Sequence, residues 1–146
     1  MIYLDTSFVT PLFREEAASR KAADFLSRQA TGALAVSKWT RVEFASLVSR
    51  DVRMGGLSAG EGRGLIAEFD SIIAASFVVL APSSYDFELA QEYVTHFSTH
   101  LRAPDALHLA IAMNNGANKI LTLDEGLLKA GKQLKLPVSR GIKQLG

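Results

Sequence analysis

The chain has 146 residues, and 16 basic against 15 acidic side chains leave a formal net charge of +1. This length corresponds to a single domain, 1–146, and a hydrophobic content of 48% is enough for a core and excludes a disordered chain. The balanced charge speaks against a uniformly basic nucleic-acid-binding protein. The lack of cysteine excludes disulfides, thiolate metal sites and a cysteine nucleophile, and it is typical of a cytoplasmic protein. Because no apolar stretch approaches the roughly 18 residues of a membrane span, we expect no membrane partner.

Short apolar runs alternate along the chain with segments of helical periodicity. The runs that predict strands are residues 2–4, 33–36, 77–80, 119–123 and 137–139. The segments that predict helices are 18–29, 38–52, 65–73, 104–115 and a short one from 125 to 130. Strands that alternate with helices pair in parallel, which predicts an α/β fold with a central parallel sheet of four to five strands.

One glycine-rich stretch interrupts this pattern. Five of the 11 glycines fall between Gly55 and Gly64. Ser58 and Glu61 have the spacing of a helix capping box, but each glycine in a first turn costs about 1 kcal/mol relative to alanine. We therefore expect a loop, or a frayed helix start, before the periodic run from Leu65.

Two aspartates come directly after predicted strands. Asp5 follows the run at 2–4, and Asp124 follows the run at 119–123. The carboxyl ends of parallel strands are where ligands bind, so both acids are candidates for one site. Each also stands where an acid can cap the helix that follows, which is the alternative explanation.

Two further acids stand where a solvated acid is not expected. Asp105 lies in the first turn of the 104–115 helix, which is apolar almost all round and therefore buried. The helix dipole alone explains an acid there, but a buried acid also needs a cation or a metal as partner. Glu43 falls within an apolar stripe between Trp39 and Leu47, and Arg50 is a possible structural partner for it.

A single chemistry can use all four acids. Clustered carboxylates repel one another unless cations neutralise them. Hard divalent ions such as Mg²⁺ or Mn²⁺ prefer oxygen ligands, so a carboxylate cluster without histidine or cysteine suits them. Such an ion activates water and stabilises charge on phosphate, which predicts hydrolysis of a phosphodiester.

Four segments in this order resemble the motifs of PIN-domain nucleases, and more narrowly the VapC-type toxins of bacterial and archaeal toxin–antitoxin pairs. The segments are Tyr3-Leu4-Asp5-Thr6-Ser7, Ser37-x-x-Thr40-x-x-Glu43, Pro104-Asp105-Ala106-Leu107-His108-Leu109-Ala110 and Leu121-Thr122-Leu123-Asp124. The resemblance covers residues 2 to about 137, nearly the whole chain. Each motif alone is weak, whereas all four in order at these spacings are specific.

The resemblance implies a three-layer α/β/α fold and a Mg²⁺- or Mn²⁺-dependent endoribonuclease. Its catalytic and metal ligands carry over onto Asp5, Glu43, Asp105 and Asp124, with Thr6, Ser7 and Thr122 as supporting hydroxyls. It also implies an RNA substrate, a homodimer, and a cognate antitoxin that holds the toxin inactive.

Other polar residues have weaker functional interpretations. His108 is one turn from Asp105, and we expect it to support or pack against the site rather than bind metal. His96 and His100 have metal-ligand spacing but no third ligand nearby, which favours an exposed helix face. Glu125 is expected to be a first-turn helix charge.

Basic residues are candidates for contacts to RNA phosphates. The chain after Glu125 carries only basic charge, from Lys129, Lys132, Lys135, Arg140 and Lys143. An ordinary solvated basic terminus explains them equally well. Closer to the proposed site, the candidates are Arg14, Arg41 and Arg102.

Two rival functions remain open from the sequence. One is a PIN-like domain that binds RNA or protein without cutting. The other is an aspartate-nucleophile phosphatase, which also begins with a strand ending in Asp. That chemistry requires a second acid two residues later as general acid, and this chain has Ser7 there.

Overall fold

In the computed structural model, which describes residues 1–14 and 18–142, five short strands form one sheet in the order β3-β2-β1-β4-β5. The strands are β1 (Ile2–Leu4), β2 (Leu34–Ser37), β3 (Val78–Leu80), β4 (Lys119–Leu121) and β5 (Val138–Ser139). Every neighbouring pair is parallel, which confirms the predicted α/β class and the five-stranded parallel sheet. Strand β4 ends two residues earlier than the sequence predicted, because the Thr122 hydroxyl turns the chain by accepting from the Asp124 amide.

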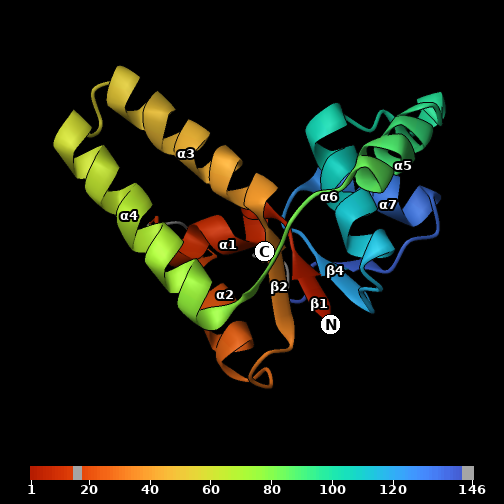
Figure 1. Cartoon of the computed structure of the whole chain (residues 1–146), viewed down its shortest axis with the longest axis horizontal. Helices are drawn as coiled ribbons and strands as arrows, with labels where there is room; N and C mark the ends of the chain where they lie inside the picture. Colours follow the sequence, from red (N-terminus) through yellow and green to blue (C-terminus); the bar gives the residue numbers. More distant parts are fainter. Residues whose placement is uncertain (15–17, 143–146) are drawn as a thin grey trace.

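Helices surround this sheet in two groups (Figure 1). Those nearest the first half of the chain are α1 (Thr6–Val9), η1 (Thr10–Leu12), α2 (Ser19–Ser27), α3 (Lys38–Arg53) and α4 (Ala59–Ser76). Those of the second half are α5 (Ser84–Val94), η2 (Phe97–Thr99), α6 (Ala103–Asn114) and α7 (Glu125–Gln133). None of the described helices is long and apolar enough to cross a membrane.

The alternation of side chains along each strand divides the core in two. Successive strand residues point to opposite faces of a sheet. Tyr3 accordingly packs with α5, α6 and α7, while Leu4 packs with α1, α3 and α4. Ile120 and Leu121 divide between the two clusters in the same way. Two cores on the two faces of one sheet make the fold three-layered, α/β/α, as expected.

The glycine-rich stretch corrects one prediction. A loop or frayed start was expected up to Leu65, and Gly55 and Gly56 do lie between α3 and α4, but α4 begins at Ala59 and continues through the other three glycines. The reciprocal hydrogen bonds between Ser58 and Glu61, each 3.0 Å long, close its first turn. A Cβ atom on Gly62 would lie 2.9 Å from Val52 Cγ2, so this glycine lets α4 pack closely on α3.

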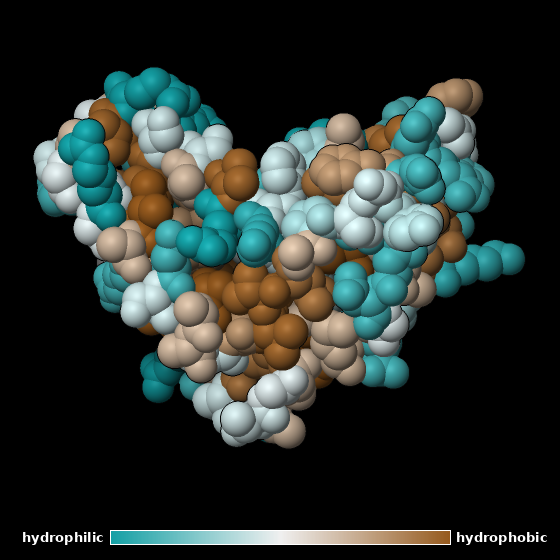
Figure 2. Space-filling model, viewed as in Figure 1, coloured by the Kyte–Doolittle hydropathy of each residue, from teal (hydrophilic) through white to brown (hydrophobic). Residues whose placement is uncertain are grey.

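The two helical groups leave a hollow between them. Figure 2 shows the surface indented between the arm formed by α3 and α4 and the lobe formed by α5 and α6. Because all strands are parallel, their carboxyl ends meet at one edge of the sheet, and the residues after β1 and β4 face this hollow. The fold therefore collects side chains from distant parts of the chain at one place.

Candidate active site

Asp5 lies at the centre of this edge, directly after β1, and its side chain is held by three donors. Asp5 is only 3% exposed. Ser7 Oγ donates to Oδ1 over 2.7 Å, the Phe8 amide donates to the same oxygen over 3.2 Å, and Thr122 Oγ1 donates to Oδ2 over 2.8 Å. Asp5 is thus the N-cap of α1 and also a fixed carboxylate facing the hollow.

Asp124 has the same double role after β4. Its Oδ1 accepts from the Leu127 amide over 2.8 Å, which caps α7. Its Oδ2 accepts from Arg102 Nη2 over 3.3 Å. The capping and site interpretations of the two strand-end aspartates are therefore compatible, because a cap engages part of the carboxylate and leaves lone pairs for another ligand.

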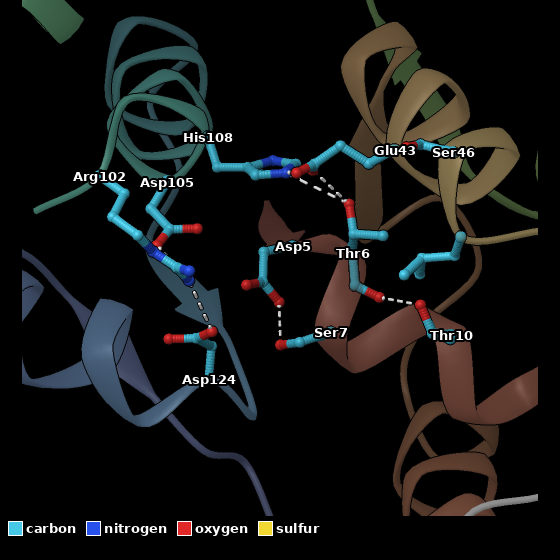
Figure 3. A pocket seen from close by; sticks show the side chains of 11 residues that line it. Asp5, Thr6, Ser7, Thr10, Glu43, Ser46, Arg102, Asp105, His108 and Asp124 are labelled. Atoms are coloured by element: carbon cyan, nitrogen blue, oxygen red, sulfur yellow. Dashed lines mark hydrogen bonds and ion pairs between the residues drawn. The ribbon is translucent and has the colours of Figure 1, made fainter. Parts of the chain in front are cut away.

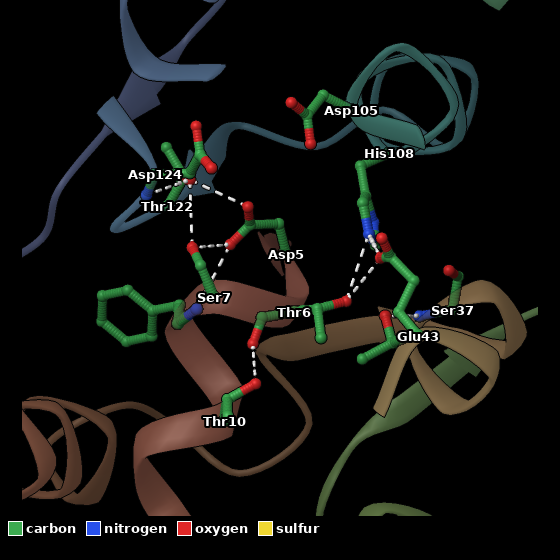
Figure 4. A network of polar contacts seen from close by, with 12 residues as sticks. Asp5, Thr6, Ser7, Thr10, Ser37, Glu43, Asp105, His108, Thr122 and Asp124 are labelled. Carbon is green, nitrogen blue, oxygen red and sulfur yellow. Dashed lines mark hydrogen bonds and ion pairs between the residues drawn. The ribbon is translucent and has the colours of Figure 1, made fainter. Parts of the chain in front are cut away.

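Glu43 reaches the site from α3 and is fixed by hydrogen bonds rather than by the Arg50 partner that the sequence suggested. Thr6 Oγ1 donates to Glu43 Oε1 over 2.7 Å, and Nε2 of the buried His108 contacts the same oxygen. On the other side of the imidazole ring, Tyr3 Oη lies 2.7 Å from His108 Nδ1. Figure 4 shows the part of this network that Thr6 of α1, Glu43 of α3 and His108 of α6 form.

Asp105 is presented by the first turn of α6, and its partner is a cation. Arg102 Nη2 lies 3.4 Å from Asp105 Oδ2, in the i,i+3 relation. The same nitrogen contacts Asp124, so one guanidinium joins two of the four acids. Figure 3 shows Arg102 between them, with Asp5 beside the pair.

The four predicted acids line a single cavity of about 320 Å³. They come from positions as far apart in sequence as Asp5 and Asp124, and they share the cavity wall with Thr6, Ser7 and His108. Thr122 lies behind the wall, where it is fully buried and binds Asp5. The structure therefore brings together every predicted acid and all three predicted supporting hydroxyls.

The acids of the cavity carry more negative charge than the nearby cations neutralise, as the raised pKa values of two of them show. Burial raises the pKa of Asp5 to about 6, against partial compensation from His108 and the hydrogen bonds of Ser7 and Thr122. Burial, and then the charge of Asp124, also raises the pKa of Asp105. Burial works in the same direction on Glu43, but the hydrogen bond and charge of His108 outweigh it and leave the pKa of Glu43 below its ordinary value.

The donor set of the cavity fits a hard divalent cation. Four carboxylates supply oxygen ligands, and the raised pKa values of Asp5 and Asp105 indicate that a further cation would be stabilised there. As the side chains stand, no three His, Asp or Glu residues within 1–14 and 18–142 are grouped so that they could hold a metal ion. Arg102 and His108 each occupy an oxygen of the acids they contact.

The basic candidates separate into three groups. Arg102 lines the acidic cavity, and Arg14 lines an adjoining hollow of about 450 Å³ that shares Ser7 and Asp124 with it. All three form ion pairs, Arg14 with Asp51 and Arg41 with Asp70, but Arg41 lines a different hollow, on α3 and α4. Lys129 and Lys132 are exposed on α7 and line neither of the cavities beside the acids. Lys143 lies outside the described residues.

Arg140 is a residue whose position the sequence did not indicate. It was one of several basic residues after Glu125, yet it lines the same hollow as Arg14. It pairs with Glu125, and its buried Nε has no hydrogen-bond partner among the described residues. Only the pairing of β5 beside β4 brings it there, so no local pattern could have revealed it.

The remaining histidines do not line this cavity. His96 and His100 flank the short η2 turn, and both are exposed. They were expected on a helix face, but His100 has a φ of 56° and ends the turn instead. Glu125 is the first residue of α7, as predicted.

Comparisons with known proteins agree with this fold. A family model described as PIN domain matches residues 2–133. Mycobacterium tuberculosis VapC20, described as a Sarcin-Ricin loop cleaving toxin, shares 20% identity over 90% of this chain and 95% of its own, with a TM-score of 0.72.

Two further solved structures are also similar. FitAcB from Neisseria gonorrhoeae is 19% identical over 97% of this chain and 98% of that one, with a TM-score of 0.71. VapBC-1 from nontypeable Haemophilus influenzae is 16% identical over the same shares, with a TM-score of 0.68. A comparison with curated proteins found no match. At identities this low, the structural similarity shows a shared fold.

Proposed function

Because the chain belongs to the PIN-domain family, we propose that it is a metal-dependent endoribonuclease and the VapC-type toxin of a toxin–antitoxin pair. One observation supports this proposal more strongly than the others. Four carboxylates from four separate segments line one cavity, although their mutual repulsion is unfavourable unless a cation joins them. Such an arrangement lowers the stability of the fold, and a surface that only binds RNA or protein does not need it.

The residues of the cavity have distinct roles in this proposal. Asp5, Glu43, Asp105 and Asp124 would hold one or two Mg²⁺ or Mn²⁺ ions. When bound, the metal activates water and stabilises the charge that develops on the phosphate.

The hydroxyl groups and His108 position the acids. Ser7 and Thr122 orient the two oxygens of Asp5, and Thr6 together with His108 orients Glu43. Hydrogen bonds to ligating carboxylates fix their orientation, so these residues act on the metal through the acids. We expect their removal to weaken metal binding without removing it.

The hollow beside the acids suits the RNA backbone. Arg14 and Arg140 line it, and it continues the acidic cavity past Ser7 and Asp124. A phosphate next to the scissile one would lie between these arginines and accept hydrogen bonds from their guanidinium groups. Contacts of this kind add affinity and make binding depend on salt.

We further propose a cognate antitoxin, a homodimer and a cytoplasmic location. The support for the antitoxin is the likeness to solved structures described as VapBC and FitAB complexes. Size-exclusion chromatography with light scattering tests the dimer directly. Co-purification with the product of a small neighbouring reading frame tests the antitoxin.

Cleavage of defined RNAs, with the ends mapped, tests the activity. Protein freed of any partner should cut RNA with Mg²⁺ or Mn²⁺ and should not cut it in chelator. Asp5→Asn should lose at least about 100-fold in rate, because it removes a ligand charge while keeping the cap of α1. Asp24→Asn, the same change on the exposed face of α2, is the matched control.

Two results would overturn the proposal. Equal cleavage by wild type and Asp5→Asn would exclude the acidic cavity as the active site. Absence of cleavage together with absence of Mn²⁺ binding would favour a PIN-like module that binds without cutting, and a covalent phosphate on Asp5 would favour the phosphatase alternative.

A further inference from the structure

Arg102 occupies the position between two of the proposed metal ligands. Its Nη2 lies 3.4 Å from Asp105 Oδ2 and 3.3 Å from Asp124 Oδ2. In Figure 3 the guanidinium projects from the start of α6 into the space between the two carboxylates. One monovalent cation therefore serves as counter-ion to two acids.

Asp124 has only one oxygen free of the fold, and Arg102 holds it. Oδ1 accepts from the Leu127 amide over 2.8 Å and caps α7. Oδ2 takes no part in this cap, so it is the oxygen that a cation can bind without disturbing α7. Arg102 donates a hydrogen bond to the same oxygen, so a metal ion and the guanidinium compete for Asp124 Oδ2.

The arginine is also easy to displace. Its side chain is 71% exposed, and the contacts to the two acids are the only side-chain hydrogen bonds it makes among the described residues. Exposed ion pairs contribute little to stability, and a long side chain at a helix start can turn into solvent. His108, at the other end of the cavity, is buried and cannot move in this way.

We infer that Arg102 is an exchangeable counter-ion that holds Asp105 and Asp124 until a divalent cation takes Asp124 Oδ2, and then binds a phosphate of the substrate. This inference rests on the proposed function. A guanidinium that is released at the rim of the cavity can donate two parallel hydrogen bonds to a phosphodiester. Metal and RNA then assist one another, because each gives one of the separated partners, the carboxylate or the guanidinium, a new counter-ion.

The inference predicts opposite effects on the two ligands. Arg102→Gln should bind Mn²⁺ about fivefold more tightly than wild type, since nothing has to be displaced. At saturating Mn²⁺ the same variant should have a higher KM for RNA, by about three- to tenfold, because the phosphate loses its cation. A change in structure alone would weaken both.

Titration of chelator-treated protein with Mn²⁺, followed by calorimetry or by the resonance of free Mn²⁺, provides the test. Arg41→Gln is the matched control, because it removes the same charge from another exposed arginine–aspartate pair, outside the acidic cavity. Its Mn²⁺ affinity should equal that of wild type.

The outcomes separate this inference from the proposed function. Unchanged Mn²⁺ affinity in Arg102→Gln, or an equal gain in Arg41→Gln, would overturn the inference while a metal site in the wild type stands. An unchanged KM for RNA would overturn the transfer of Arg102 to phosphate. Failure of both wild type and Arg102→Gln to bind Mn²⁺ would overturn the inference and the proposed function together.

Discussion

The two ends of the acidic cavity neutralise their carboxylates in opposite ways. At the inner end, Glu43 is held by Thr6 and by His108, whose side chain is 2% exposed. At the outer end, Asp105 and Asp124 share Arg102, whose side chain is 71% exposed. The inner end is part of the core and keeps one geometry, whereas the outer end can exchange its cation. A site that must be both ordered and open to ligands can separate the two requirements in space.

The largest effect that this contrast predicts concerns His108. Replacement by alanine should lower the free energy of unfolding by about 3 kcal/mol, because Tyr3, Thr6 and Glu43 lose a buried partner. Denaturant unfolding of the metal-free protein measures this. Arg102→Ala is the comparison at the outer end and should cost less than about 1 kcal/mol. Similar losses in the two variants would remove the distinction between the ends.

Asp5, which stands between the two ends, should destabilise the metal-free protein when it is ionised. Its pKa is near 3.8 in an unfolded chain and about 6 in the fold, so the folded state binds more protons between these values. The cost of the charge is absent at low pH, grows as the pH rises through this window and is complete above it. Asp5→Asn, which keeps the cap, should therefore be more stable than wild type by up to about 3 kcal/mol at pH 8.

The pH dependence of that difference provides its check. Thermal or denaturant unfolding in chelator should show the gain of Asp5→Asn shrinking to nothing near pH 4. Asp24→Asn, on the exposed face of α2, should show no such trend. A gain that persists at low pH would mean that the charge of Asp5 is not its cause.

The smallest expected effects lie beyond the outer end, at Arg14 and Arg140. Each change to glutamine should weaken RNA binding a few-fold and lower the slope of log affinity against log salt by about 0.7, the value for one phosphate on a single strand. Binding across a salt series measures both. Arg53→Gln, exposed at the far end of α3, should leave the slope unchanged. Equal slopes for all three variants would mean that the RNA backbone binds outside the hollow lined by Arg14 and Arg140.

The parts of this site that the sequence predicted depend on local pattern and on sheet direction. Asp5 and Asp124 each follow an apolar run, and parallel pairing of those runs is enough to put both at one edge. Asp105 was identifiable because an acid opens an otherwise apolar helix. Arg102 was predicted only as a candidate contact to RNA phosphates, and neither of its ion pairs, with Asp105 and with Asp124, was predicted.

The parts that the sequence did not predict depend on packing between distant segments. The contact of His108 with Glu43 joins residues 65 positions apart, and Arg140 reaches its hollow only through the pairing of β5 with β4. Helix α5 was not among the predicted elements, although Ser83 and Asp86 form its capping box. The glycines of α4 were misleading because Gly62 serves close helix packing, which no local propensity reports.

The central place of β1 in the sheet has a consequence for the synthesis of the chain. Asp5 is made long before Thr122, which orients it and lies 117 positions further along the chain. Strand β1 cannot gain its second neighbour, β4, until the chain as far as Leu121 has left the ribosome. A nascent or truncated chain that stops before Asp124 therefore carries Asp5 and Glu43 without Asp124, and the four carboxylates can assemble only once Asp124 has emerged.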